Sequence, residues 1–215
     1  REYRNYLERF AGEPDARLAE NRIRYLSTYA PTKRVDRDLI DLLGLISATP
    51  QTRLQLGRLL FRQRHYDQAI PHLEAASSDT SGSPEGAYLL AEALLAIDRR
   101  QDILTGSGER YQDRALAILR ELSATGQNSE FADDAAFRVI EIQHGSGDTA
   151  SVRTRIEAYD QFVKSYPTSD RLSEGILKQA NAHLTLARFD TKHVDLARAK
   201  YGKIGNADDK LGEQA

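Results

Sequence analysis

The sequence predicts an all-α protein made of antiparallel helix pairs, and three observations lead to this fold class. Apolar residues recur at the period of an amphipathic helix over long segments of the chain. The alternating β-branched runs that are typical of half-buried strands do not occur. Short clusters rich in Gly, Pro, Ser and Asp separate the periodic segments and indicate turns. We therefore expect a largely helical chain without a sheet.

The segment 52–76 contains the clearest helix pair. Gly57 lies in its first helix, and Ala69, Leu73 and Ala76 lie in its second helix, after a polar break. Small residues allow two antiparallel helices to approach, and the larger ones fill the space toward the next pair. The spacing of these residues closely resembles that of tetratricopeptide repeats. The resemblance implies that Gly57 packs against Ala69.

The same pattern recurs, less regularly, along the rest of the chain. We expect irregular helices over 1–49 and repeats at about 50–83, 84–127, 128–168 and 169–207, with an exposed insertion at 98–110. The resemblance implies one domain over 1–215, in which the antiparallel helix pairs stack into a right-handed superhelix. The sequence contains no Met, and we expect it to be a fragment of a longer chain.

A narrower resemblance lies in the segment 156–167, which reads IEAYDQFVKSYP. It is similar to repeats of bacterial cell-envelope proteins of the BamD and Tol–Pal-associated type. The helix expected after it, near Arg171, lacks the pair of Ala residues that is usual there. This resemblance implies a location in the periplasm or cell envelope.

The composition argues against several classes of partner. The chain has 30 Lys and Arg residues against 32 Asp and Glu residues, and a net charge of −2. A nucleic-acid binder or a polybasic membrane surface needs a basic excess instead. There is no Cys to form disulfides or thiolate metal sites. No apolar run approaches the ~20 residues of a membrane-spanning helix.

No motif indicates catalysis, a cofactor or a metal. The histidines are scattered and form no HExxH motif, and the Gly-Ser-Gly clusters lack the Lys of a phosphate-binding loop. Asp133 and Asp134 are explained by the favourable effect of negative charge at a helix start. No Gly-x-Ser-x-Gly motif is present. We therefore expect no enzymatic activity, no cofactor and no metal site.

The resemblance to tetratricopeptide repeats also implies where a partner binds. In such repeats the first helix of each pair lines a concave groove, which suits a protein or peptide partner. For each groove position, packing between repeats remains the alternative. The expected groove residues are Arg58, Phe61, Arg62, Tyr88, Glu92, Phe137, Glu141 and Asn181.

The sequence thus predicts a protein-interaction scaffold, which the narrower resemblance places in a bacterial envelope complex. Two alternatives stay open. In the first, the chain is a non-catalytic superhelical region of a larger cell-wall enzyme. In the second it is a self-assembling repeat protein whose exposed surfaces bind copies of itself.

Overall fold

The described part of the chain is helical. The computed structural model describes residues 40, 49–78, 82–105, 109–124, 131–144 and 149–212, which form helices joined by turns and contain no strand. The expectation of an all-α fold is confirmed for these residues. The helices expected over 1–49 lie outside them, apart from positions 40 and 49.

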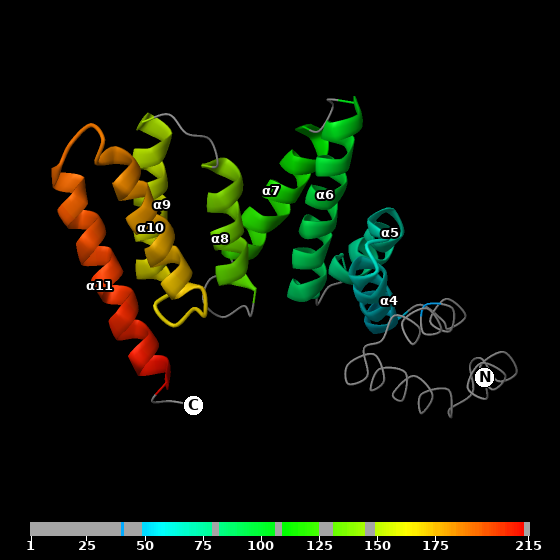
Figure 1. Cartoon of the computed structure of the whole chain (residues 1–215). Coiled ribbons are helices and arrows are strands. Elements are labelled where there is room, and N and C mark those ends of the chain that lie inside the picture. The colour runs from blue at the N-terminus through cyan, green and yellow to red at the C-terminus, as the bar shows by residue number, and fades with distance from the viewer. Residues whose placement is uncertain are drawn as a thin grey trace, which may run out of the picture. The chain divides into compact units, whose positions relative to one another are not determined.

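The chain divides into two compact units, Arg1–Ile118 and Leu119–Ala215. The division falls inside α7 (Glu109–Ala124), so this helix contributes residues to both units. The first unit also contains α4 (Pro50–Arg62), α5 (Tyr66–Ser77) and α6 (Pro84–Thr105) (Figure 1). The helix α5 packs against both α4 and α6, and α4 also touches α6.

Local sequence explains where α4 begins. Pro50 occupies the first helical position, where its missing N–H and fixed φ are compatible with the helix. The side chain of Thr49 caps the helix by accepting a hydrogen bond of 3.2 Å from the backbone N–H of Thr52. This capped start fixes the chain direction of the first helix pair.

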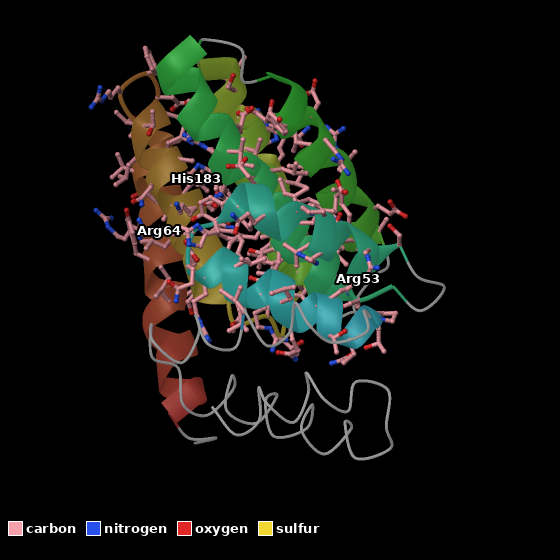
Figure 2. The ribbon with its side chains drawn as sticks, turned by 90° about the vertical axis from the view of Figure 1, so that its right-hand side faces the viewer. Arg53, Arg64 and His183 are labelled. Carbon is pink, nitrogen blue, oxygen red and sulfur yellow. The ribbon has the colours of Figure 1, made fainter. Side chains whose placement is uncertain are left out.

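A tight turn reverses the chain between α4 and α5. The N–H of Arg64 donates to the carbonyl of Phe61, and the N–H of His65 donates to the carbonyl of Leu60, both at 2.9 Å. These two bonds make a Schellman motif, which requires a left-handed residue after the helix. Arg64 takes that place with a φ of 62°. Figure 2 shows Arg53 and Arg64 near opposite ends of α4.

The close contact at Gly57 differs from the expectation. A Cβ on Gly57 would lie 2.6 Å from Cδ2 and 2.7 Å from Cγ of Leu73. Leu73, and not Ala69, therefore supplies the nearest atoms to this glycine, although both side chains are fully buried. Leu73 fills the space that the missing Cβ of Gly57 leaves. The packing of α4 against α5 therefore depends on one small and one large residue.

The segment 98–110, expected as an exposed insertion between two helices, is helical over the part that the structure describes. The helix α6 continues without a break through Thr105, and α7 begins at Glu109. Asp98 is only 7% exposed, so the helix still has a buried face there. The physical reason is composition: residues 98–105 contain neither Gly nor Pro, and most of them are tolerated well in helices.

The second unit contains α8 (Ala132–Gln143), α9 (Thr149–Ser165), α10 (Leu172–Leu186) and α11 (Lys192–Gly212). Consecutive helices pack against one another and run in alternating directions (Figure 1). An aromatic cluster joins α8 to α9: the Phe137 ring centroid lies 5.6 Å from that of Tyr159 and 5.3 Å from that of Phe162. Gly175 at the start of α10 leaves room for Phe162, whose Cδ1 atom would lie 3.2 Å from an added Cβ.

Candidate functional site

The groove residues expected on α4 have neighbours within the first unit. The Arg58 guanidinium is one-third exposed and forms a two-pronged ion pair with Glu85 in the first turn of α6, with a distance of 2.6 Å between Nε and Oε1. Phe61 lies edge-on to Tyr66, with 5.3 Å between the ring centroids. Arg58 therefore links consecutive first helices, and Phe61 packs at the turn within its own pair.

The other three expected residues of the first unit lie on α4 and α6. Arg62 is exposed in the last turn of α4, and Tyr88 and Glu92 are half-buried on α6. The residues Tyr88 and Glu92 are four apart and share a helix face, as expected.

Phe137 was wrongly expected to line the groove. Its side chain is 1% exposed and lies at the centre of the aromatic cluster. The guanidinium of Arg171 covers one face of its ring at 5.1 Å from the centroid. A buried aromatic side chain of this kind stabilises the fold and is not available to a partner.

Glu141 and Asn181, two of the expected groove residues, lie at the same cavity. Both line a cavity of about 290 Å³ in the second unit, between α8, α9 and α10. Each helix supplies residues at helical spacing, so that one face of each helix meets the cavity. The lining residues are Glu141 and His144 on α8, Arg155 and Tyr159 on α9, and Lys178, Asn181, Ala182 and Thr185 on α10.

The charges at the cavity form a network around Glu141. Its carboxylate accepts hydrogen bonds from Nη1 of Arg138 at 3.0 Å and from Nζ of Lys178 at 3.2 Å. Burial alone raises the pKa of Glu141, but the two cationic donors outweigh burial and hold this pKa below its ordinary value. Glu141 is therefore ionised and already partnered.

Arg155 adds a further cation to this lining. Its Nη1 atom donates to the carbonyl of His144 at 3.3 Å, whereas its Nε atom is buried and has no hydrogen-bond partner among the described residues. Beside it, burial and then the Glu141 carboxylate raise the pKa of Tyr159 to about 12, although Arg155 acts in the opposite direction. The phenol therefore remains uncharged near neutral pH. The cavity lining thus contains two cations, Lys178 and Arg155, and one carboxylate, that of Glu141, while Glu174 also acts on Tyr159.

Sequence reasoning missed the contribution of α9 to this cavity. Arg155 and Tyr159 lie on the second helix of their pair, and only first-helix positions were expected to face a partner. The signal that was present is their spacing of four residues, which places a cation and a phenol on one helix face. The spacing of Lys178 also placed it near the site, because it lies one turn before Asn181 on the same face of α10.

Comparisons with known proteins do not assign a family. No protein-family model matches the sequence, and no curated protein was found to be significantly similar to it.

Two further kinds of feature are absent from the described residues. None of their helices combines the length and the apolar composition that crossing a membrane requires. The same ranges contain no group of three or more His, Cys, Asp or Glu side chains placed to hold a metal ion.

Proposed function

We propose that this chain is a protein-interaction scaffold that binds a peptide or a peptide-like segment of a partner protein. The binding surface in this proposal is the side formed by the first helices of the pairs, α4, α6, α8 and α10. The four pairs stack in this account into a right-handed superhelix of the tetratricopeptide kind. The ion pair between Arg58 and Glu85 supports such stacking, because it joins the first helices of two consecutive pairs.

One observation carries the proposal: the cavity between α8, α9 and α10, which two of the expected groove residues line. At about 290 Å³ it lies near the lower limit of small-molecule pockets, a size that suits one or two side chains of a bound peptide. Leu177 and Leu184 are 41% and 44% exposed and share a face of α10 with Asn181. Apolar anchors therefore lie close in sequence to the residues of a polar cavity.

The electrostatics of the cavity favour binding over catalysis. A general acid or base works best with a pKa near the operating pH. The pKa of Glu141 is lowered and that of Tyr159 is raised, so both are shifted away from neutrality. Such shifts keep Glu141 as a fixed charge and Tyr159 as a fixed neutral donor. The excess of cations suits a partner segment that carries an acidic side chain beside apolar ones.

Filling the cavity tests this function with a matched control. Thr185 is exposed at the cavity, and its hydroxyl donates to the carbonyl of Asn181 at 3.1 Å. Thr154 is exposed on α9, makes the equivalent bond to the carbonyl of Ala150 at 3.2 Å, and does not line the cavity. Peptides selected from a random display library on the natural chain should lose affinity for Thr185→Trp by about tenfold or more. They should bind Thr154→Trp unchanged.

Two outcomes oppose the proposal: a library that yields no binder, or binders that do not distinguish the two tryptophan variants. The acidic preference is tested separately with a double-mutant cycle. Arg155→Gln in the chain and acid-to-amide changes in the selected peptide should be non-additive if the two groups interact. Additive losses would place the acidic side chain elsewhere on the surface.

Self-association is a second candidate that one observation favours. Large apolar side chains are exposed along the last helix pair, including Phe189 at 74% and Leu196 at 43%. Exposed apolar groups of this kind mark contact surfaces when they gather in one patch. Light scattering over a dilution series should show a mass that rises with concentration and falls for Phe189→Ser. A constant monomer mass would remove this candidate.

A further inference from the structure

Two histidines meet edge to edge between α10 and α11. The Nδ1 atoms of His183 and His193 lie 2.9 Å apart, and their ring planes are inclined by only 27°. The ring centroids are 5.2 Å apart, close to the Nδ1–Nδ1 distance plus the two ring radii. Both nitrogens therefore lie near the line between the ring centres, where the in-plane lone pair of one ring faces the N–H of the other. Figure 2 shows His183 on α10.

This geometry describes a hydrogen bond and not a metal site. Two metal ligands direct their lone pairs at a common third point, whereas these two nitrogens point at each other. An N–H···N bond needs one Nδ1 that carries a proton and one that does not. The neutral pair meets this condition, and so does the pair with one added proton. A second added proton places two N–H groups and two positive charges head to head.

Burial and nearby charged groups determine how readily His183 takes up a proton. Around His183, α9 presents Asp160, and α11 presents Lys200 as well as His193. Burial lowers the pKa of His183 most, and His193 and Lys200 lower it further, while Asp160 opposes them. Asp160 is itself bonded to Lys164, Gln179 and Lys200. On the side of His193, Asp190 is held by Lys192 at 2.8 Å. Much of the nearby negative charge is therefore already paired.

We propose that His183 and His193 form a proton-operated clasp that holds α11 against α10 and opens when the pair takes up its second added proton. The histidine pair lies at the contact between α10 and α11, where Ala197 is also buried. Opening the clasp releases the last described helix from the end of the helical stack. The device is independent of the proposed binding function, since none of its residues lines the cavity.

The direction of the effect follows from linkage. His183 binds a proton less readily when α11 is docked than when α11 is free, because its pKa is lowered in the docked state. Acid therefore favours the free state over the range between the lowered value and the ordinary value of 6.5. Docking is restored as the pH rises through that range. The population ratio changes by about tenfold for each unit by which the two pKa values differ.

Hydrogen exchange of the full chain between about pH 5 and about pH 8, corrected for intrinsic exchange rates, measures this opening. Protection of α11 amides should fall toward the acidic end, while protection of α4 and α5 changes little. His193→Gln is the decisive variant, because Gln can still bond to Nδ1 of His183 but does not titrate. Its α11 should lose less protection in acid than that of the natural chain, because the second imidazole is gone while burial still lowers the pKa of His183. His65→Gln, which replaces an exposed histidine at the turn before α5, should behave like the natural chain.

Nitrogen-detected NMR of the imidazoles supplies a second readout if a variant folds poorly. The natural chain should show one Nδ1–H tautomer and one Nε2–H tautomer at neutral pH, with two separated proton-binding steps. Equal pH dependence of α11 protection in the natural chain and in His193→Gln would overturn the proposal. So would a pair of histidines that titrate independently.

Discussion

At Gly57 the backbone of α4 lies against the side chain of Leu73 on α5, with no room for a Cβ between them. Gly202 on α11 is the opposite case, because no atom lies within 4 Å of the place of its Cβ. Both glycines lie inside helices, where Gly is less favourable than Ala by roughly 0.5–1 kcal/mol. The two positions therefore separate the packing effect from the effect of helix propensity.

Gly57→Ala should lower the free energy of unfolding by about 1–3 kcal/mol, because the new methyl group overpacks a buried contact. Gly202→Ala should raise it by roughly 0.5–1 kcal/mol, because Ala favours the helix and meets nothing. Urea denaturation of both variants measures the difference. A Gly57→Ala protein as stable as the natural one would mean that Leu73 does not pack there.

Arg64 gives a second residue-scale prediction. It is exposed and adopts a left-handed conformation that costs an L-residue about 1 kcal/mol or more. Arg64→Gly should therefore stabilise the first unit by up to about 1 kcal/mol, since the Schellman turn favours Gly. Thermal unfolding checks this, with Arg64→Ala as a control that keeps the strain. Loss of stability in the Gly variant would contradict the turn assignment.

Asp160 sets a dependence on acid at lower pH than the histidine clasp does. The hydrogen bond from Lys164 is the largest cause that lowers its pKa from 3.8 to about 2, against the effect of burial. A carboxylate with a depressed folded-state pKa stabilises the fold above its unfolded pKa and loses that contribution as the pH falls.

The contribution that the Asp160 carboxylate makes through its own ionisation should thus be complete above its unfolded pKa, in the comparison of the natural chain with Asp160→Asn. It should shrink as the pH falls through 3.8 toward about 2. Chemical denaturation at a series of pH values measures this difference. A difference that does not change with pH would show that the ion pairs of Asp160 contribute nothing to folding.

At the scale of elements, α6 shows where sequence patterns were sufficient and where they were not. The clusters at residues 106–108 and 145–147 correctly indicated that helices end nearby, because Gly breaks the helical pattern. The length of α6 was missed, because the first helix of the repeat at 84–127 was expected to end before an insertion at 98–110. A repeat period constrains where packing recurs, but it does not stop a run of helix-forming residues from continuing.

Replacing residues 98–105 with alternating Gly and Ser should therefore destabilise the first unit. Each Gly costs about 1 kcal/mol relative to Ala inside a helix, so the sum reaches several kcal/mol. The buried side chain of Asp98 is lost as well. A replacement that is rich in Ala and keeps Asp98 serves as the control and should retain most of the helix content by circular dichroism. A harmless Gly/Ser replacement would restore the loop interpretation.

The candidate site was predictable only in part, for a reason that lies in the helices. Glu141 and Asn181 were predicted because first-helix positions repeat along the chain, and they share a cavity. Phe137 has the same register but turns inward, since the aromatic residues Tyr159 and Phe162 offer it a core. Periodicity assigns a residue to a face of its own helix. It does not say which neighbouring helix covers that face.

At the scale of the whole molecule, neighbouring helices pack in pairs within each unit, α4 with α5 in the first and α8 with α9 and α10 with α11 in the second. Each repeat depends on its neighbours to bury its apolar face, and the surface of the first helices is the part that such arrays leave for a partner. We therefore expect a bound peptide to contact α8 and α10 and to lie close to Arg155 on α9.

Photo-crosslinking of a selected peptide to the full chain tests that claim most directly. A photoreactive residue placed beside the acidic position of the peptide should form adducts with residues of α8 and α10 that line the cavity. The adducts should disappear in Thr185→Trp and persist in Thr154→Trp. Adducts confined to exposed residues of α9 and α11, such as Glu157 or Asp195, would contradict the account, because the partner would then bind the second helices of the pairs.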